Sequence, residues 1–168
     1  LFSALATGGS VVAAHYLGQK KREKACLSAN QLLLSVTVLS SAIALISLLF
    51  NRLILSLIFG HVEKAVMESA VTYFYLSALS YPFLGIYNGC AALCRSMGNS
   101  KISMKTSLCM NCINIAGNSV FLYLFQMGVA GVGMATLISR ITAAIIMCII
   151  ILNKTNTIYI DFALGFSP

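Results

Sequence analysis

Three long stretches of the chain contain no charged residue, and they constrain the fold more than any motif does. They run from Ala25 to Asn51, from Ser69 to Cys94 and from Thr106 to Ser139. About 20 mostly apolar residues cross a bilayer as a helix. The first two stretches therefore each hold one crossing, and the third holds a crossing, a turn and the start of another. Only 9% of the 168 residues are charged, against roughly 25% in soluble domains, which argues against a soluble globular fold.

From these stretches we predict an all-α fold, a polytopic transmembrane helix bundle of about five spans. The spans cover roughly residues 1–17, 28–50, 69–93, 102–125 and 129–152. Pro82, near the middle of the third span, removes a backbone hydrogen bond and predicts a kink. Gly85 and Gly89, four residues apart, predict a face on which another helix packs closely. Residues 53–59 end the second span or form a short helix on the membrane, and residues 126–133 form a glycine-rich turn.

Basic residues lie in the loops between the spans, where they orient membrane proteins. Successive loops carry four, two, three and no basic residues, and Lys154 follows the last span. This alternation predicts that the first and third loops are cytoplasmic, in an integral protein of a bacterial inner membrane. The same placement argues against nucleic acid as a partner, despite a net charge of +7. Because Leu1 already lies in an apolar segment, we expect a further segment upstream of it.

Two polar stripes lie on neighbouring spans, at a depth where lipid would accept none. Residues spaced three or four apart stack on one face of a helix. They are Ser107, Asn111, Asn114 and Asn118 on the fourth span, and Thr136, Ser139 and Arg140 on the fifth. An amide in hydrocarbon costs several kcal/mol unless it finds a partner, so both faces must point inward. They either bond the helices together or contact a cation or a substrate.

Arg140 is the one charged residue that lies deep inside a predicted span, and no acidic residue accompanies it there. The four acids, Glu23, Glu63, Glu68 and Asp161, all lie outside the proposed spans. Arg140 lies about 11 residues into its span, roughly 17 Å deep at 1.5 Å per residue. It either pairs with an acid from a helix outside this sequence or faces water.

The third span holds most of the tyrosines, among them Tyr81 and Tyr87. Packing or a belt at the membrane interface would explain them. Alternatively, they line a substrate cavity and offer cation–π contacts to an organic cation.

Enzymatic and metal sites find little support in the sequence. Cys109 and Cys112 have the C-x-x-C spacing, but no second ligand pair accompanies them, and small packing residues explain them better. His15 and His61 are isolated, and no hydrolase or metalloprotease motif is present. We expect no catalytic residue, no metal site and no cofactor other than a coupling ion.

Three segments together resemble one family, the multidrug and toxic compound extrusion (MATE) transporters. They are GGSVVAAHYLGQKKREKA (residues 8–25), ALCRSMGNSKISM (92–104) and INIAGNSVFLYLFQMGVAGVGMATLISR (113–140). The likeness is to helices two to six of the N-terminal lobe, in a family of about twelve helices in two lobes. It implies that residues 1–168 form an incomplete N-terminal transmembrane lobe. The first helix and the C-terminal lobe of the same protein would then be its partners, with the lipid bilayer and a small-molecule substrate.

The resemblance also implies a function, the export of amphipathic, often cationic molecules in exchange for H⁺ or Na⁺. It assigns a cation site to Asn114, Asn118 and Thr136. Asn118 departs from the family pattern, in which an Asp often stands there; an amide cannot take up a proton but can offer its carbonyl oxygen to Na⁺. From the residues themselves we add Asn111, Tyr81, Tyr87 and Arg140 as substrate-cavity candidates. The alternative is a lipid-linked precursor flippase of the same wider superfamily, which would need a strongly cationic cavity.

Overall fold

The computed structural model describes residues 2–60 and 63–152, and in these residues every regular element is helical. His61, Lys154, Asp161 and the tail that follows Lys154 lie outside the described residues. The elements are α1 (Phe2–Gly18), α2 (Arg22–Leu49), α3 (Asn51–Phe59), α4 (Lys64–Leu79), α5 (Tyr81–Ser96), α6 (Ser100–Ser119), a π-helical turn η1 (Val120–Leu124) and α7 (Gly128–Leu152).

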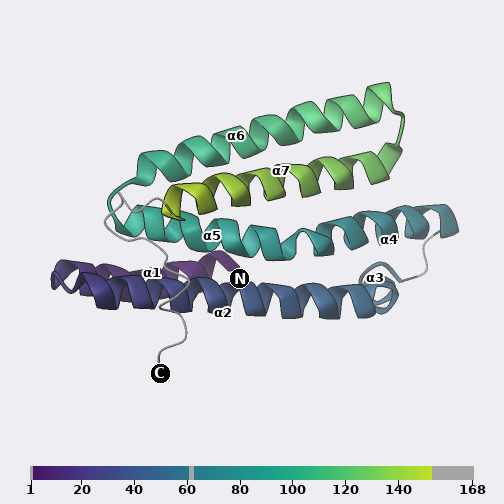
Figure 1. The fold of residues 1–168 in the computed structure, drawn as a ribbon. Helices are drawn as coiled ribbons and strands as arrows, with labels where there is room; N and C mark the ends of the chain where they lie inside the picture. Colours follow the sequence, from purple (N-terminus) through teal and green to yellow (C-terminus); the bar gives the residue numbers. More distant parts are fainter. Residues whose placement is uncertain (1, 61–62, 153–168) are drawn as a thin grey trace.

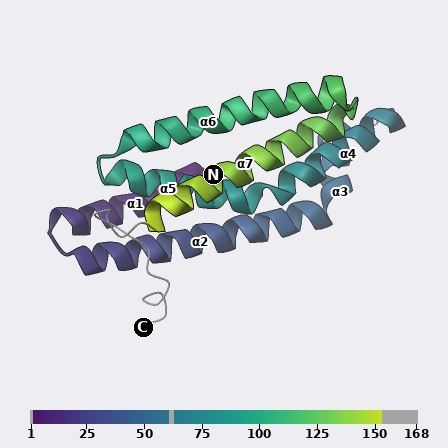
Figure 2. The ribbon, with the colours of Figure 1, turned by 45° about the horizontal axis from the view of Figure 1, so that its top comes forward.

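The long helices form a bundle in which successive passages run antiparallel (Figures 1 and 2). Helices α1 and α2 pair along one side, and α5 packs on both of them. Helix α7 packs on α4, α5 and α6, whereas α6 lies at the edge of the bundle and contacts only α7, η1 and α5 among the described elements. The helices α6 and α7 with the polar stripes are therefore direct neighbours.

The predicted number of passages agrees with this arrangement. Three helical segments are individually long and apolar enough to cross a membrane: α2, α6 with η1, and α7. Helix α1 has 17 residues and α4 and α5 have 16 each. Helices α4 and α5 lie end to end (Figure 1) and make one passage, interrupted at Ser80. Since Pro82 lies in the first turn of α5, the predicted kink is confirmed as a break in the helix.

Several boundaries differ from the sequence prediction, and α4 begins five residues earlier than expected, at Lys64. The turn before α7 is shorter than residues 126–133, because α7 begins at Gly128, where φ is +55° and favours glycine. Gly131 and Gly133 lie inside the helix, and a Cβ atom on Gly133 would come within 2.7 Å of Leu76 Cδ1. They are therefore packing glycines, not turn glycines. Helix α2 also begins six residues earlier than expected, at Arg22.

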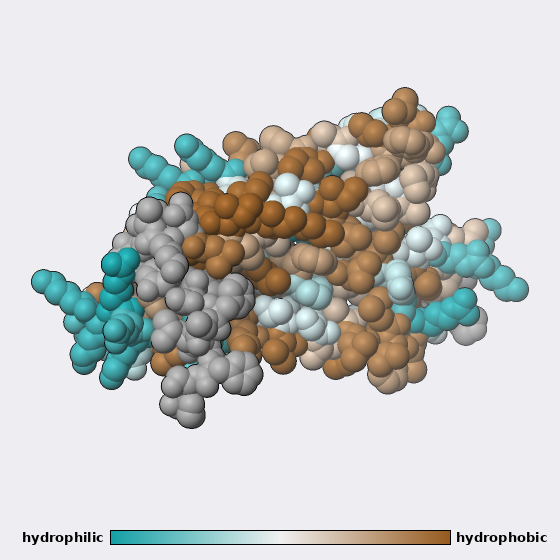
Figure 3. All heavy atoms as spheres, viewed as in Figure 1, coloured by the Kyte–Doolittle hydropathy of each residue, from teal (hydrophilic) through white to brown (hydrophobic). Residues whose placement is uncertain are grey.

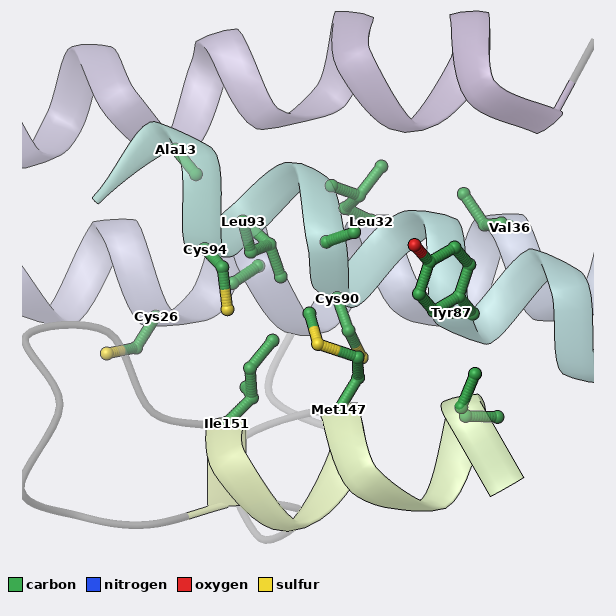
Figure 4. Close-up of a cluster of buried hydrophobic side chains, with 14 of the residues drawn as sticks. Ala13, Cys26, Leu32, Val36, Tyr87, Cys90, Leu93, Cys94, Met147 and Ile151 are labelled. Carbon is green, nitrogen blue, oxygen red and sulfur yellow. The ribbon is translucent and has the colours of Figure 1, made fainter. Parts of the chain in front are cut away.

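The hydrophobic core lies where α5 crosses between α1, α2 and α7 (Figure 4). A Cβ atom on Gly85 would lie 2.5 Å from Ser40 Oγ, so α5 and α2 approach as closely as the Gly85/Gly89 spacing predicts. Cys90 is buried in this core. Cys109 and Cys112 are exposed on α6 and do not pack within the described bundle.

The charged residues gather at the two ends of the bundle, with an apolar surface between them (Figure 3). The loop between α1 and α2 and the loop between α5 and α6 lie at one end, and α3 and the turn after η1 lie at the other (Figure 1). The first end carries the basic residues Lys20, Lys21, Arg22, Lys24, Arg95, Lys101 and Lys105. The structure thus confirms that the two loops richest in basic residues share one end.

Candidate functional site

A cluster of amides and hydroxyls joins α6 to α7. Asn114 Nδ2 donates to Thr136 Oγ1 (3.3 Å) and to Ser139 Oγ (3.4 Å) across the two helices. Asn118 Nδ2 donates to Asn114 Oδ1 (3.1 Å) within α6. The three residues to which the cation site was assigned, Asn114, Asn118 and Thr136, therefore meet at one place.

Small residues bring the two helices close enough for these bonds. A Cβ atom on Gly117 would lie 3.0 Å from the Cβ of Ala135, which is tighter than nearly all contacts between Cβ atoms. Close backbone approach at small residues is the usual way in which polar side chains of membrane helices reach one another. Gly117 and Ala135 stand next to Asn118 and Thr136 in the sequence, so the close approach and the polar cluster coincide.

The cluster leaves one acceptor unsatisfied. Both hydroxyls donate to carbonyl groups of their own helix, Thr136 Oγ1 to Val132 O (2.9 Å) and Ser139 Oγ to Thr136 O (2.9 Å). Asn118 Oδ1 is buried and accepts no hydrogen bond from the residues that the structure describes. A buried carbonyl oxygen without a donor costs about 1–3 kcal/mol. Its chemistry suits a hard cation such as Na⁺, which takes neutral oxygen ligands, and it cannot hold a proton.

The rest of the α6 stripe does not join the cluster. Asn111 is exposed and, within residues 2–60 and 63–152, its side chain makes no hydrogen bond. The sequence placed Asn111 on the same face as Asn114 and Asn118, but α7 covers only the later part of that face. Asn111 therefore remains a substrate-contact prediction on an open surface of the described bundle.

The two candidate tyrosines have different surroundings. Tyr87 is only 8% exposed and lies in the core near Val36 and Met147 (Figure 4). Packing in the core accounts for the position of Tyr87, and a substrate contact by this side chain stays a prediction. Tyr81 is half-buried, and its ring lies 5.9 Å from the ring of Phe2, tilted by 59°.

Arg140 contacts the break between α4 and α5. Its Nη1 donates to the hydroxyl of Ser80, a fully buried residue that itself donates to Ser77 O (2.6 Å). Sequence reasoning missed Ser80, because serines in membrane helices usually bond to their own backbone. Its position two residues before Pro82 could have identified it, because a proline interrupts the helix and a hydroxyl at such a break can bond to a neighbouring helix.

The charge at this contact is not balanced within the described chain. Glu23, Glu63 and Glu68 lie at or near the ends of α2 and α4, and the electrostatic neighbours of Arg140 are the phenols of Tyr73 and Tyr81. A half-buried guanidinium thus lies near mid-bundle without a carboxylate from residues 2–60 or 63–152.

Comparison with known proteins decides the family. The MatE family model matches residues 1–120, well over half of the chain. This chain belongs to the MatE family. A transporter of Bacillus subtilis strain 168, the uncharacterized YisQ, is 31% identical over 167 residues, with 92% of this chain and 34% of YisQ covered. The predicted membership in the MATE transporters is therefore confirmed.

Solved MATE structures share the fold. An inward-facing multidrug resistance MATE family transporter of the MOP superfamily matches 99% of this chain with a TM-score of 0.90 at 22% identity. An outward-facing transporter of the same description matches 99% with a TM-score of 0.90 at 21% identity. The chain covers 38% and 37% of these two proteins, and so spans about a third of the length of its relatives. The chain is an integral membrane protein of the MatE family.

Proposed function

We propose that this chain is the N-terminal lobe region of a secondary active efflux transporter. The transporter exports amphipathic or cationic small molecules in exchange for Na⁺ or H⁺ by alternating access. Family membership supports transport, and the free carbonyl oxygen of Asn118 at the α6–α7 interface supports ion coupling. Of the two ions, the ligands present fit Na⁺ better, because Asn114, Asn118 and Thr136 offer neutral oxygens and no group that titrates.

The comparison with two states supports the mechanism. The fold matches a transporter described as inward-facing and one described as outward-facing equally well, with TM-scores of 0.90. A lobe that keeps its fold in both states moves as a body against its partner lobe, as alternating access requires. Ion binding then shifts the equilibrium only as far as the ion prefers one state.

Gradient-driven transport by the full-length protein tests the proposal. In proteoliposomes, efflux of a fluorescent organic cation should follow an imposed Na⁺ gradient and stop when both the Na⁺ and the pH gradients are dissipated. Asn118→Ala should lower Na⁺-driven efflux at least tenfold. Asn88→Ala is the matched control, because among the described residues Asn88 Nδ2 bonds only to Leu84 O of its own helix (2.9 Å). Uphill efflux that persists without either gradient would refute coupled exchange.

A lipid-linked precursor flippase is the second candidate. The observation that favours it is Arg140, a cation at mid-bundle without an acid beside it in the described residues. Tight binding of a lipid pyrophosphate, with no binding of organic cations, would support the flippase and oppose cation export.

A further inference from the structure

Arg140 lies at the centre of its helix, which makes its charge costly. Helix α7 runs from Gly128 to Leu152, so twelve residues stand on each side of Arg140, about 18 Å from either end at 1.5 Å per residue. A charged residue at this depth is rare, and usually faces a partner or a water-filled space that serves the function. The group that pairs with Arg140 therefore bears on the function of the protein as well as on its stability.

Most N–H donors of the Arg140 guanidinium form no hydrogen bond with the residues that the structure describes. It carries five N–H donors, and the hydrogen bond to Ser80 uses one of them. Glu23, Glu63 and Glu68, the acids in the described part of the chain, are not among its electrostatic neighbours. The remaining donors have no acceptor among the residues that the structure describes, and are open to an acceptor from elsewhere.

Ser80 holds the guanidinium in place. The serine hydroxyl donates to Ser77 O, which leaves its lone pairs to accept from Arg140. Because Ser80 is fully buried at the break between α4 and α5, this contact fixes where the arginine points.

In the described part of the chain, the surroundings of Arg140 provide phenol groups and an aromatic ring and no negative charge. Tyr73 and Tyr81 lie close enough to interact electrostatically with Arg140, and the ring of Phe2 packs on Tyr81. A guanidinium beside phenol groups matches a carboxylate, which accepts two parallel N–H bonds.

We propose that Arg140, held by Ser80, binds a carboxylate of the transported molecule. The transporter then selects zwitterionic or carboxylate-bearing amphipaths over simple organic cations. This inference rests on the proposed export function and names its substrate class. The aromatic rings of Phe2 and Tyr81 would cover the apolar part of the ligand next to its acid.

A matched pair of dyes tests the inference. A xanthene dye with a free carboxylic acid is a zwitterion, and its ethyl ester is a cation with the same ring system. Binding to the purified full-length protein is measured by fluorescence anisotropy, and export is measured in proteoliposomes. Wild type should bind the acid more tightly than the ester. Arg140→Gln should raise the Kd of the acid at least tenfold, the loss that one charge-assisted hydrogen bond represents, and leave the Kd of the ester unchanged.

Three further variants make the result interpretable. Arg140→Lys keeps the charge without the paired donors and should recover part of the affinity for the acid. Arg52→Gln removes an arginine from the exposed side of α3 and should leave the Kd of both dyes unchanged. Ser80→Ala keeps the charge but frees the guanidinium. Ser80→Ala should raise the Kd of the acid by a few fold and leave the Kd of the ester unchanged. This variant provides the test if Arg140→Gln does not fold.

The outcomes that overturn the inference are distinct from those that overturn export. Equal loss of both dyes in Arg140→Gln would mean that the partner carboxylate belongs to the protein itself. Competition by phosphatidylglycerol in the vesicles would make a lipid phosphate the ligand. Either result, or tighter binding of the ester by wild type, refutes substrate recognition by Arg140 and leaves gradient-driven export standing. Selective binding of the acid without any gradient-driven export would refute the proposed function and leave the carboxylate site standing.

Discussion

Removing Asn114 should destabilise the protein far more than removing its neighbour Asn118. Asn114 takes part in three hydrogen bonds, with Thr136, Ser139 and Asn118. Polar bonds between membrane helices average about 0.6 kcal/mol each, so Asn114→Ala should cost about 2 kcal/mol. Asn118→Ala removes one of these bonds and also the buried oxygen that lacks a donor. Its net cost should therefore be about 0.5 kcal/mol or less.

The two variants should behave alike when the stabilisation by Na⁺ is measured. An ion that binds only the folded state stabilises it by about 2.7 kcal/mol at a concentration 100 times its Kd. If Asn118 Oδ1 is a ligand, Asn118→Ala keeps the stability of the Na⁺-free protein and loses this gain. Asn114→Ala should lose both, because Asn114 positions the amide of Asn118.

Thermal unfolding of the purified full-length protein can measure both effects. The melting temperature is compared in NaCl and in choline chloride of equal ionic strength, with Asn88→Ala as the control amide. If Na⁺ stabilises Asn118→Ala as much as wild type, Asn118 is not a ligand and the cluster only joins the helices. If Asn118→Ala costs as much as Asn114→Ala in choline, the hydrogen-bond accounting is wrong.

Three further predictions follow from packing and topology. Gly85→Ala should cost about 1–3 kcal/mol in thermal unfolding, because its Cβ would overlap Ser40, whereas Gly8→Ala, with nothing within 4 Å of the new atom, should be neutral or stabilising. Tyr87→Ala should cost about 3–5 kcal/mol, as loss of a buried ring does, while Tyr87→Phe should keep stability and transport. In intact cells, an impermeant maleimide should label Lys64→Cys and should not label Lys101→Cys; the opposite pattern would invert the proposed orientation.

The sequence predicted the passages well because the bilayer imposes a simple rule on each of them. A backbone in hydrocarbon must satisfy its own hydrogen bonds, so a long charge-free run becomes a helix whatever surrounds it. Pro82 lies in such a run and still interrupts it, since it lacks an N–H group wherever it stands. The break at Ser80 was therefore predictable to within two residues.

Glycine was harder to interpret from sequence. Residues 126–133 look like a turn because glycine is common in turns. Gly128 does open the turn with a positive φ, but Gly131 and Gly133 serve packing, against Phe121 and Leu76. Which role a glycine plays depends on whether another helix approaches it, and the local sequence does not contain that information.

The same dependence decides which polar residues form the site. Asn111, Asn114 and Asn118 are equivalent by helical spacing, yet within the described bundle only Asn114 bonds to α7, and Asn118 joins the cluster by bonding to Asn114. Two crossing helices touch over a limited length, and here they approach closely where Gly117 meets Ala135. One turn further along α7 from Thr136, Arg140 reaches a different neighbour, Ser80 at the break between α4 and α5. Helix α7 therefore borders the amide cluster of α6 through Thr136 and Ser139 and itself carries Arg140. The two sites that we propose along it would take ligands of opposite charge.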